Sequence, residues 1–130
     1  MVSPNYFIFS FLFNLKDPNN NFCINKNLVR KDSKLLIDGY PGSGQSFLLK
    51  YTLHNTNIRK NTIIHHTHSS IISTKAVELG IPTVILIRHP DEAVYSLISR
   101  WKYIPFDIAY NYYLEYYESI LQSNNSIFLL

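Results

Sequence analysis

A glycine-rich segment carries the clearest chemical signal in this sequence. Residues 39–46 read GYPGSGQS, which fits the spacing G-x-x-x-x-G-x-S. Glycines let the backbone turn back on itself, so that successive N–H groups point inward, and a helix that follows adds its positive end. An apolar run at residues 35–37 precedes the segment and helical apolar spacing follows it, which is the context that a phosphate-binding loop needs. The sequence therefore predicts such a loop, and the alternative is an ordinary strand-to-helix turn.

Gln45 indicates which phosphate chemistry this loop would serve. Kinases and nucleoside triphosphate hydrolases place a lysine at this position to neutralise phosphate charge, and a later strand supplies an aspartate for Mg²⁺. Here the lysine is replaced by glutamine, and the strand-like run at residues 83–87 ends in Arg88. The sequence therefore disfavours hydrolysis of a nucleoside triphosphate.

Arg88 is a second candidate for contact with an anion. It would leave the carboxyl end of a buried parallel strand, which is where open α/β sheets bind their ligands. A guanidinium matches phosphate through paired hydrogen bonds. Ser96 falls in the first two turns of the next predicted helix and could add a hydroxyl to the same phosphate. The alternatives are a surface ion pair for Arg88 and a solvated position for Ser96.

The segment His66-Thr67-His68 could supply a base. If this segment is extended, residues two apart share a face, so both imidazoles could point into the same crevice. A histidine whose pKa lies near the working pH suits the removal of a proton from a hydroxyl. A zinc site would need further ligands, and no cysteine or acidic cluster supplies them, so we predict no metal. A structural or surface role for both histidines stays open beside catalysis.

The elements that must position these residues alternate along the chain. Apolar runs, caps and helix-breaking residues predict the order β-α-β-α-β-α-α-β, which indicates a three-layer α/β fold with a mainly parallel sheet. The predicted strands cover residues 35–37, 62–64, 83–87 and 127–130, and the predicted helices cover 47–54, 73–79, 90–101 and 106–122.

The last predicted helix is rich in tyrosine and could suggest an aromatic acceptor pocket. Its aromatic and apolar residues recur at helical spacing, so we expect a stripe that faces the core instead. The members of this stripe are Phe106, Tyr110, Tyr113, Tyr117 and Ile120.

Composition sets limits on the setting and the partners. The 130 residues suit one domain, and a net charge of +3 suits an anionic ligand but is too small to indicate nucleic acid. Cys23 is the only cysteine, so we expect a reducing, cytoplasmic location. Residues 6–15 are aromatic and apolar but too short to span a membrane. We expect them to pack on the domain, and membrane association through them is the less favoured alternative.

Three segments together resemble the sulfotransferase family. Residues 40–47 (YPGSGQSF) resemble its 5′-phosphosulfate loop, and residues 88–96 (RHPDEAVYS) resemble its 3′-phosphate motif. His66-Thr67-His68 lies between them and resembles the family's K-T-H segment, which carries the catalytic histidine. The order and spacing of all three make the resemblance more specific than any single match.

The resemblance implies a P-loop NTPase-like fold and 3′-phosphoadenosine-5′-phosphosulfate as the co-substrate. His68 would be the base toward a hydroxyl of a small molecule or glycan, and Arg88 and Ser96 would hold the 3′-phosphate. The 5′ end of the nucleotide would be bound by Gly42, Ser43, Gly44, Gln45 and Ser46.

The sequence departs from the family pattern in ways that bear on rate. The family places a lysine or arginine where this chain has Gly42, and such a cation would stabilise the charge that develops as the sulfuryl group leaves. We expect residues 1–34 to form an apolar segment and a polar connector. We expect residues 35–130 to form the N-terminal half of the domain, which would be incomplete at its C-terminal end. A remnant that binds nucleotide phosphates without catalysis is the main alternative function, and a P-loop kinase or NTPase is the less favoured one.

Overall fold

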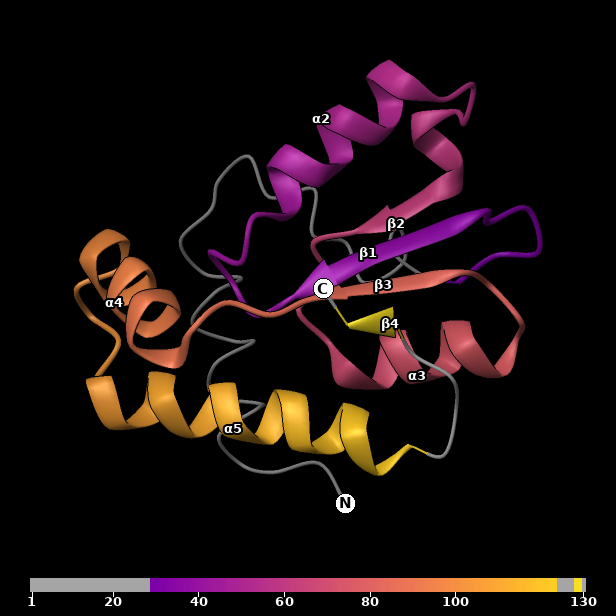
Figure 1. Ribbon diagram of the computed structural model, residues 1–130. Helices are drawn as coiled ribbons and strands as arrows, with labels where there is room; N and C mark the ends of the chain where they lie inside the picture. Colours follow the sequence, from indigo (N-terminus) through magenta and orange to yellow (C-terminus); the bar gives the residue numbers. More distant parts are fainter. Residues whose placement is uncertain (1–28, 124–127, 130) are drawn as a thin grey trace.

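A parallel β-sheet forms the centre of the computed structural model, which describes residues 29–123 and 128–129 (Figure 1). Strands β1 (Leu35–Gly39), β2 (Ile63–His65) and β3 (Thr83–Leu86) lie in the order β2-β1-β3. The two-residue β4 (Phe128–Leu129) pairs with the outer edge of β3, also in parallel. The predicted α/β class, parallel sheet and order of elements are confirmed. The expectations for residues 6–15 and for Ile127 and Leu130 lie outside the described residues.

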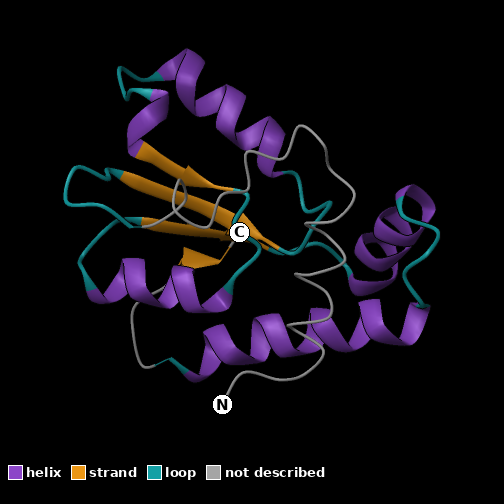
Figure 2. Ribbon diagram, turned by 180° about the vertical axis from the view of Figure 1, so that it is seen from behind, coloured by secondary structure: helices purple, strands orange, loops and turns teal. Residues whose placement is uncertain are grey.

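Helices cover both faces of this sheet (Figures 1 and 2). One face is covered by α2, and α3 and α5 lie on the other; α4 follows β3 near the carboxyl ends of the strands. The helices and the single 3₁₀ turn η1 of the described residues are α2 (Gln45–Asn55), η1 (Lys60–Thr62), α3 (Ser70–Glu78), α4 (Pro90–Arg100) and α5 (Phe106–Gln122).

β1 is buried because successive side chains enter different cores. Ile37 packs with Leu49 of α2 and Ile63 of β2 on one face. Leu36 joins the larger cluster on the other face, where it packs with residues of α3, α4 and α5. A strand covered on both sides has no solvent-facing side, which explains why its sequence is apolar up to Asp38.

α3 begins earlier than the sequence predicts. The expected start was residue 73, whereas the helix begins at Ser70 because Ser69 caps it: the Ser69 Oγ accepts a hydrogen bond from the Ile72 N–H at 3.3 Å. α3 ends at Glu78, one residue before the predicted end, and Leu79 is its C-cap. Gly80 has a left-handed φ of 72°, and its N–H and that of Ile81 donate to helix carbonyls at 2.9 Å, as in a Schellman motif.

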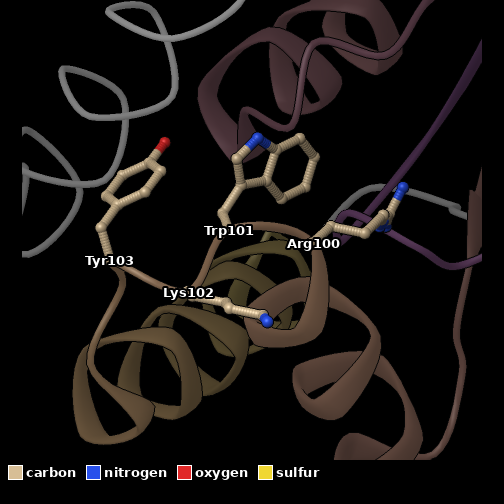
Figure 3. A pocket seen from close by; sticks show the side chains of 4 residues that line it. All are labelled: Arg100, Trp101, Lys102 and Tyr103. Atoms are coloured by element: carbon tan, nitrogen blue, oxygen red, sulfur yellow. The ribbon is translucent and has the colours of Figure 1, made fainter.

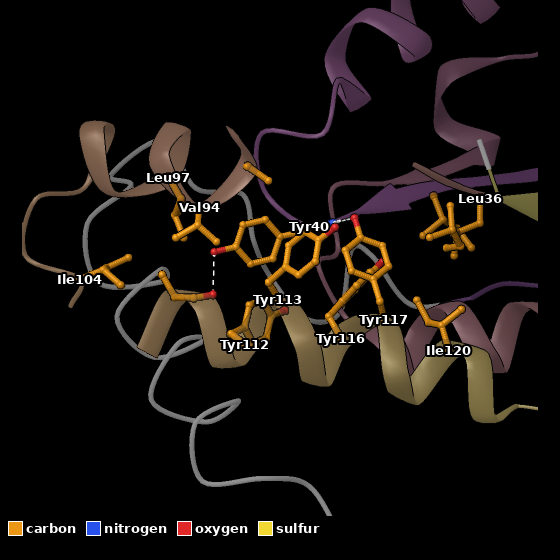
Figure 4. Close-up of a cluster of buried hydrophobic side chains, with 14 of the residues drawn as sticks. Leu36, Tyr40, Val94, Leu97, Ile104, Tyr112, Tyr113, Tyr116, Tyr117 and Ile120 are labelled. Atoms are coloured by element: carbon orange, nitrogen blue, oxygen red, sulfur yellow. Dashed lines mark hydrogen bonds between the residues drawn. The ribbon is translucent and has the colours of Figure 1, made fainter. Parts of the chain in front are cut away.

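α5 buries a broader face than the predicted stripe (Figure 4). Tyr113, Tyr117 and Ile120 are buried as expected, and Tyr112 and Tyr116 are buried beside them. The prediction is wrong for Phe106, which is 51% exposed. Phe106 lies in the first turn of the helix and stacks on Tyr110 instead, with ring centroids 5.8 Å apart.

Within residues 29–123 and 128–129, no helix has both the length and the apolar composition required to cross a membrane.

Candidate functional site

The predicted site residues gather at the carboxyl ends of the parallel strands. The loop after β1 leads into α2, the segment after β2 carries the histidines, and the segment after β3 carries Arg88 and leads into α4 (Figure 1). Parallel strands end at the same edge of a sheet, so the fold brings all three segments together.

The glycine loop joins β1 to α2 through two left-handed residues, Gly42 at φ 84° and Gly44 at φ 96°. Gly44 is the N-cap of α2, and no side chain caps the helix. A Cβ at Gly44 would meet nothing within 4 Å, so the backbone angle rather than crowding requires glycine there. The first N–H groups of α2 therefore lie beside an exposed glycine that no side chain covers. This geometry suits the binding of an anion.

Gln45 and Ser46 begin α2 but face different surroundings. Gln45 is only 3% exposed, and its amide nitrogen donates to the Gly39 carbonyl at 2.8 Å, so this side chain braces the base of the loop. Ser46 is exposed, and its hydroxyl lies 3.0 Å from His66 Nε2. Of the two, Ser46 is the side chain that a ligand on the loop could reach.

Arg88 and Ser96 both approach Gly42. Arg88 Nη1 donates to the Gly42 carbonyl at 3.1 Å, and a Cβ placed on Gly42 would lie 3.1 Å from Ser96 Oγ. Arg88 also forms an ion pair with Glu92, at 3.0 Å, and its side chain is 42% exposed. The structure therefore brings Arg88 and Ser96 to the loop, and it also shows the surface ion pair that was the alternative for Arg88.

The histidine segment is not extended, so the condition under which both imidazoles would share a face is not met. His66 and His68 both have left-handed backbone angles, with φ of 55° and 51°. Hydrogen bonds to the buried carboxylate of Asp38 account for this bend: the Thr67 hydroxyl donates to Oδ2, and the His68 N–H donates to Oδ1 at 3.0 Å. The Ser73 hydroxyl of α3 donates to the same carboxylate at 3.3 Å. The two imidazoles consequently point to different partners.

His68 is held in the tautomer that a base requires. Its Nδ1 lies 2.9 Å from the Gly39 carbonyl, which can only accept, and 3.3 Å from the Gln45 amide nitrogen, which already donates to that carbonyl; the shorter contact favours the tautomer with the proton on Nδ1. Nε2 is then the nitrogen that can accept a proton. Burial lowers the pKa of His68, and the nearby Asp38 carboxylate opposes this only in part, so the ring is neutral near pH 7.

His66 lies between His65 and the start of α2. Its Nδ1 is 2.8 Å from His65 Nδ1, and its Nε2 contacts Ser46. Burial, with smaller contributions from the other histidines, lowers the pKa of His66 to about 4, and burial also lowers the pKa of His65.

These lowered pKa values predict that acid destabilises the fold. An unfolded histidine titrates near pH 6.5, whereas folded His66 titrates near 4. Between these values the unfolded chain binds more protons, so the free energy of unfolding falls as the pH falls through this window. We expect a lower urea midpoint at about pH 4.5 than at about pH 7. His66→Asn should reduce that difference, and an unchanged difference would contradict the assignment to His66.

Three contributors to the site were missed from the sequence. Asp38 is a fully buried residue of β1 that shapes the histidine segment, and a carboxylate directly after a buried apolar run is the signal that could have indicated it. Tyr117 was assigned only to the core, yet its hydroxyl also contacts the glycine loop. Arg100 lies four residues after Ser96 and therefore on the same face of a helix, which is the signal that could have indicated it.

Comparisons with protein-family models, with curated proteins and with solved structures found no match to this chain. In the part of the chain that the structure describes, no three histidine, cysteine or acidic side chains are grouped so that they could hold a metal ion. The candidate site is therefore defined by its own geometry: an open glycine loop, two arginines, hydroxyl groups and a buried neutral histidine.

Proposed function

We propose that this chain binds 3′-phosphoadenosine-5′-phosphosulfate and transfers its sulfuryl group to a hydroxyl acceptor. The loop at residues 42–46 would bind the 5′ end, and Arg88 and Ser96 would bind the 3′-phosphate. The fold would be of the P-loop NTPase type, which the unit of central strand β1, glycine loop and helix α2 supports.

The contact between Gly42 and the Arg88–Ser96 segment carries this proposal. The two segments are separated by more than forty residues, and the resemblance assigns them to the two phosphate ends of one nucleotide. Arg88 reaches the Gly42 carbonyl at 3.1 Å, and Ser96 Oγ lies 3.1 Å from the position of a Gly42 Cβ. One small ligand could therefore contact both segments at once.

The proposed transfer moves one group and one proton. The acceptor's hydroxyl oxygen forms a bond to sulfur, and the bond between sulfur and the oxygen of the 5′-phosphate breaks. The hydroxyl proton passes to His68 Nε2, and the 3′,5′-bisphosphate leaves with the electron pair of the broken bond. The neutral His68 tautomer, with Nδ1–H on the Gly39 carbonyl, supports the role of base.

Nucleotide binding without catalysis is the second candidate function. The observation that favours it is the burial of His68, which is only 8% exposed, so an acceptor hydroxyl has little access to its ring. The absence of a side chain at Gly42 points the same way, because the loop itself then contributes no cation near the transferred group.

Calorimetry and a single-turnover assay test the two candidates. We expect 3′-phosphoadenosine 5′-phosphate to bind at least about 10-fold more tightly than ATP, with or without Mg²⁺, because ATP has no 3′-phosphate for Arg88 and Ser96. Tighter binding of ATP with Mg²⁺ would contradict the proposal and favour a kinase or NTPase.

Excess protein mixed with ³⁵S-labelled donor and a panel of hydroxyl acceptors should give labelled product. Binding without product for any acceptor would leave the second candidate.

A further inference from the structure

Arg100 brings a second guanidinium to the glycine loop from a distant part of the chain. It is the last residue of α4, one turn after Ser96, and its Nε donates to the Ser96 carbonyl at 3.2 Å. This bond turns the side chain back along the helix. Figure 3 shows it extending toward the trace of the glycine loop, beside a pocket of about 550 Å³ that Trp101, Lys102 and Tyr103 also line.

The guanidinium of Arg100 occupies the space in front of Gly42. A Cβ at Gly42 would lie 3.1 Å from Arg100 Nη2 and 3.1 Å from Ser96 Oγ, which is closer than ordinary van der Waals contact. Gly42 also has a φ of 84°, an angle that L side chains rarely adopt. A side chain at Gly42 would therefore have to displace the ends of Arg100 and Ser96 and adopt a strained backbone angle, and a cation from α4 lies at this position instead.

No carboxylate neutralises Arg100 among residues 29–123 and 128–129. The ion pairs of these residues do not include it, whereas Arg88 is paired with Glu92. The guanidinium carbon lies 4.8 Å from the centroid of the Trp101 ring, a contact that leaves the charge of Arg100 in place. Arg100 also lowers the pKa of His68, so its charge acts at the buried end of the site. A cation between a glycine loop and a serine hydroxyl, without an acidic partner, suits an anionic ligand.

We infer that Arg100 contacts the 5′-phosphosulfate end of the nucleotide and supplies the positive charge that the loop lacks at Gly42. This inference rests on the proposed function. As the bond between sulfur and the bridging oxygen breaks, negative charge collects on the 5′-phosphate, and Arg100 is placed to stabilise it. Arg88 and Arg100 then divide the ligand between them, with Arg88 at the 3′-phosphate and Arg100 at the 5′ end.

Ligands that carry one phosphate each can separate these two roles. We would measure calorimetric dissociation constants of the full chain for adenosine 5′-phosphate, adenosine 3′-phosphate and the 3′,5′-bisphosphate. Arg100→Ala should weaken binding of the 5′-phosphate and of the bisphosphate by roughly 10- to 100-fold, and should change binding of the 3′-phosphate by less than about 3-fold. Arg100→Lys should recover part of the loss, because a single ammonium replaces a forked guanidinium.

Lys102→Ala is the matched control. It removes the same charge two residues away and should change each dissociation constant by less than about 2-fold. Thermal unfolding of each variant checks that the fold persists. If Arg100→Ala matches Lys102→Ala, or weakens only the 3′-phosphate, the inference is wrong while the proposed function stands. If the wild-type chain binds none of the three nucleotides, both are wrong.

Discussion

Arg88→Ala is expected to weaken binding of 3′-phosphoadenosine 5′-phosphate by roughly 30- to 150-fold, which corresponds to about 2–3 kcal/mol for a lost charged hydrogen-bond partner. The side chain lies in the segment after β3 and donates to the carbonyl of Gly42, the residue that Ser96 also approaches. Its removal would take away the proposed ligand contact and the hydrogen bond to the loop carbonyl of Gly42. Because the side chain is partly exposed, the thermal midpoint should change little. Titration calorimetry measures the effect.

A change at Glu92 serves as a control, because it should alter bisphosphate affinity in the opposite direction. Its carboxylate is paired with Arg88 at 3.0 Å, so it competes with a phosphate for the same guanidinium. Glu92→Gln should therefore tighten bisphosphate binding, by about 2- to 5-fold given the weakness of exposed ion pairs. If Arg88→Ala leaves the dissociation constant unchanged, Arg88 is only a member of a surface ion pair and its assignment to the 3′-phosphate is wrong.

Asp38→Ala is expected to destabilise the fold by about 3–5 kcal/mol. The carboxylate is fully buried and accepts hydrogen bonds from the Thr67 hydroxyl, the His68 N–H and the Ser73 hydroxyl. Removing it leaves these donors without an acceptor in the core and frees the left-handed turn that carries both histidines. Urea unfolding at pH 7 measures the loss.

Two further variants test whether the loss of stability comes from the hydrogen bonds to Asp38. Asp38→Asn keeps one acceptor oxygen but turns an NH₂ group toward donors, so an intermediate loss is expected. Asp91→Ala removes a carboxylate whose side chain is 78% exposed, and should change stability by less than about 0.5 kcal/mol. An Asp38→Ala protein as stable as the Asp91→Ala protein would show that the hydrogen bonds to Asp38 contribute little.

The sequence predicts the framework better than the site. The apolar run at β3 and the Gly80 cap are local signals, because burial on both faces and a left-handed helix end each leave a direct mark on residue types. The glycine loop can be predicted for the same reason, because its left-handed backbone angles require glycine. The conformation of His66 and His68 is not, because Asp38, about thirty residues away, determines it through hydrogen bonds.

The position of Arg100 is also a feature that the sequence does not predict. The sequence shows that Gly42 lacks a cation, and it shows an arginine at the end of a helix, but nothing local connects the two. Only the packing of α4 against the loop places the guanidinium in front of Gly42. The position of a charge relative to a loop is a tertiary property, so a search for a motif along the chain cannot detect it.

The tyrosine hydroxyls of α5 reach the segment after each of the three longer strands. Tyr117 donates to the Leu86 carbonyl at 2.7 Å and accepts from the Tyr40 N–H at 3.2 Å, while Tyr113 donates to the Arg88 carbonyl at 2.6 Å and Tyr112 to that of His68. One rigid helix thus fixes the backbone of all three site segments before any ligand arrives. Association should then require little ordering of the chain, and most of the interaction energy would remain available for affinity. It also means that core and site are not independent in evolution: a tyrosine-to-phenylalanine change that the core tolerates would still alter the geometry of the site.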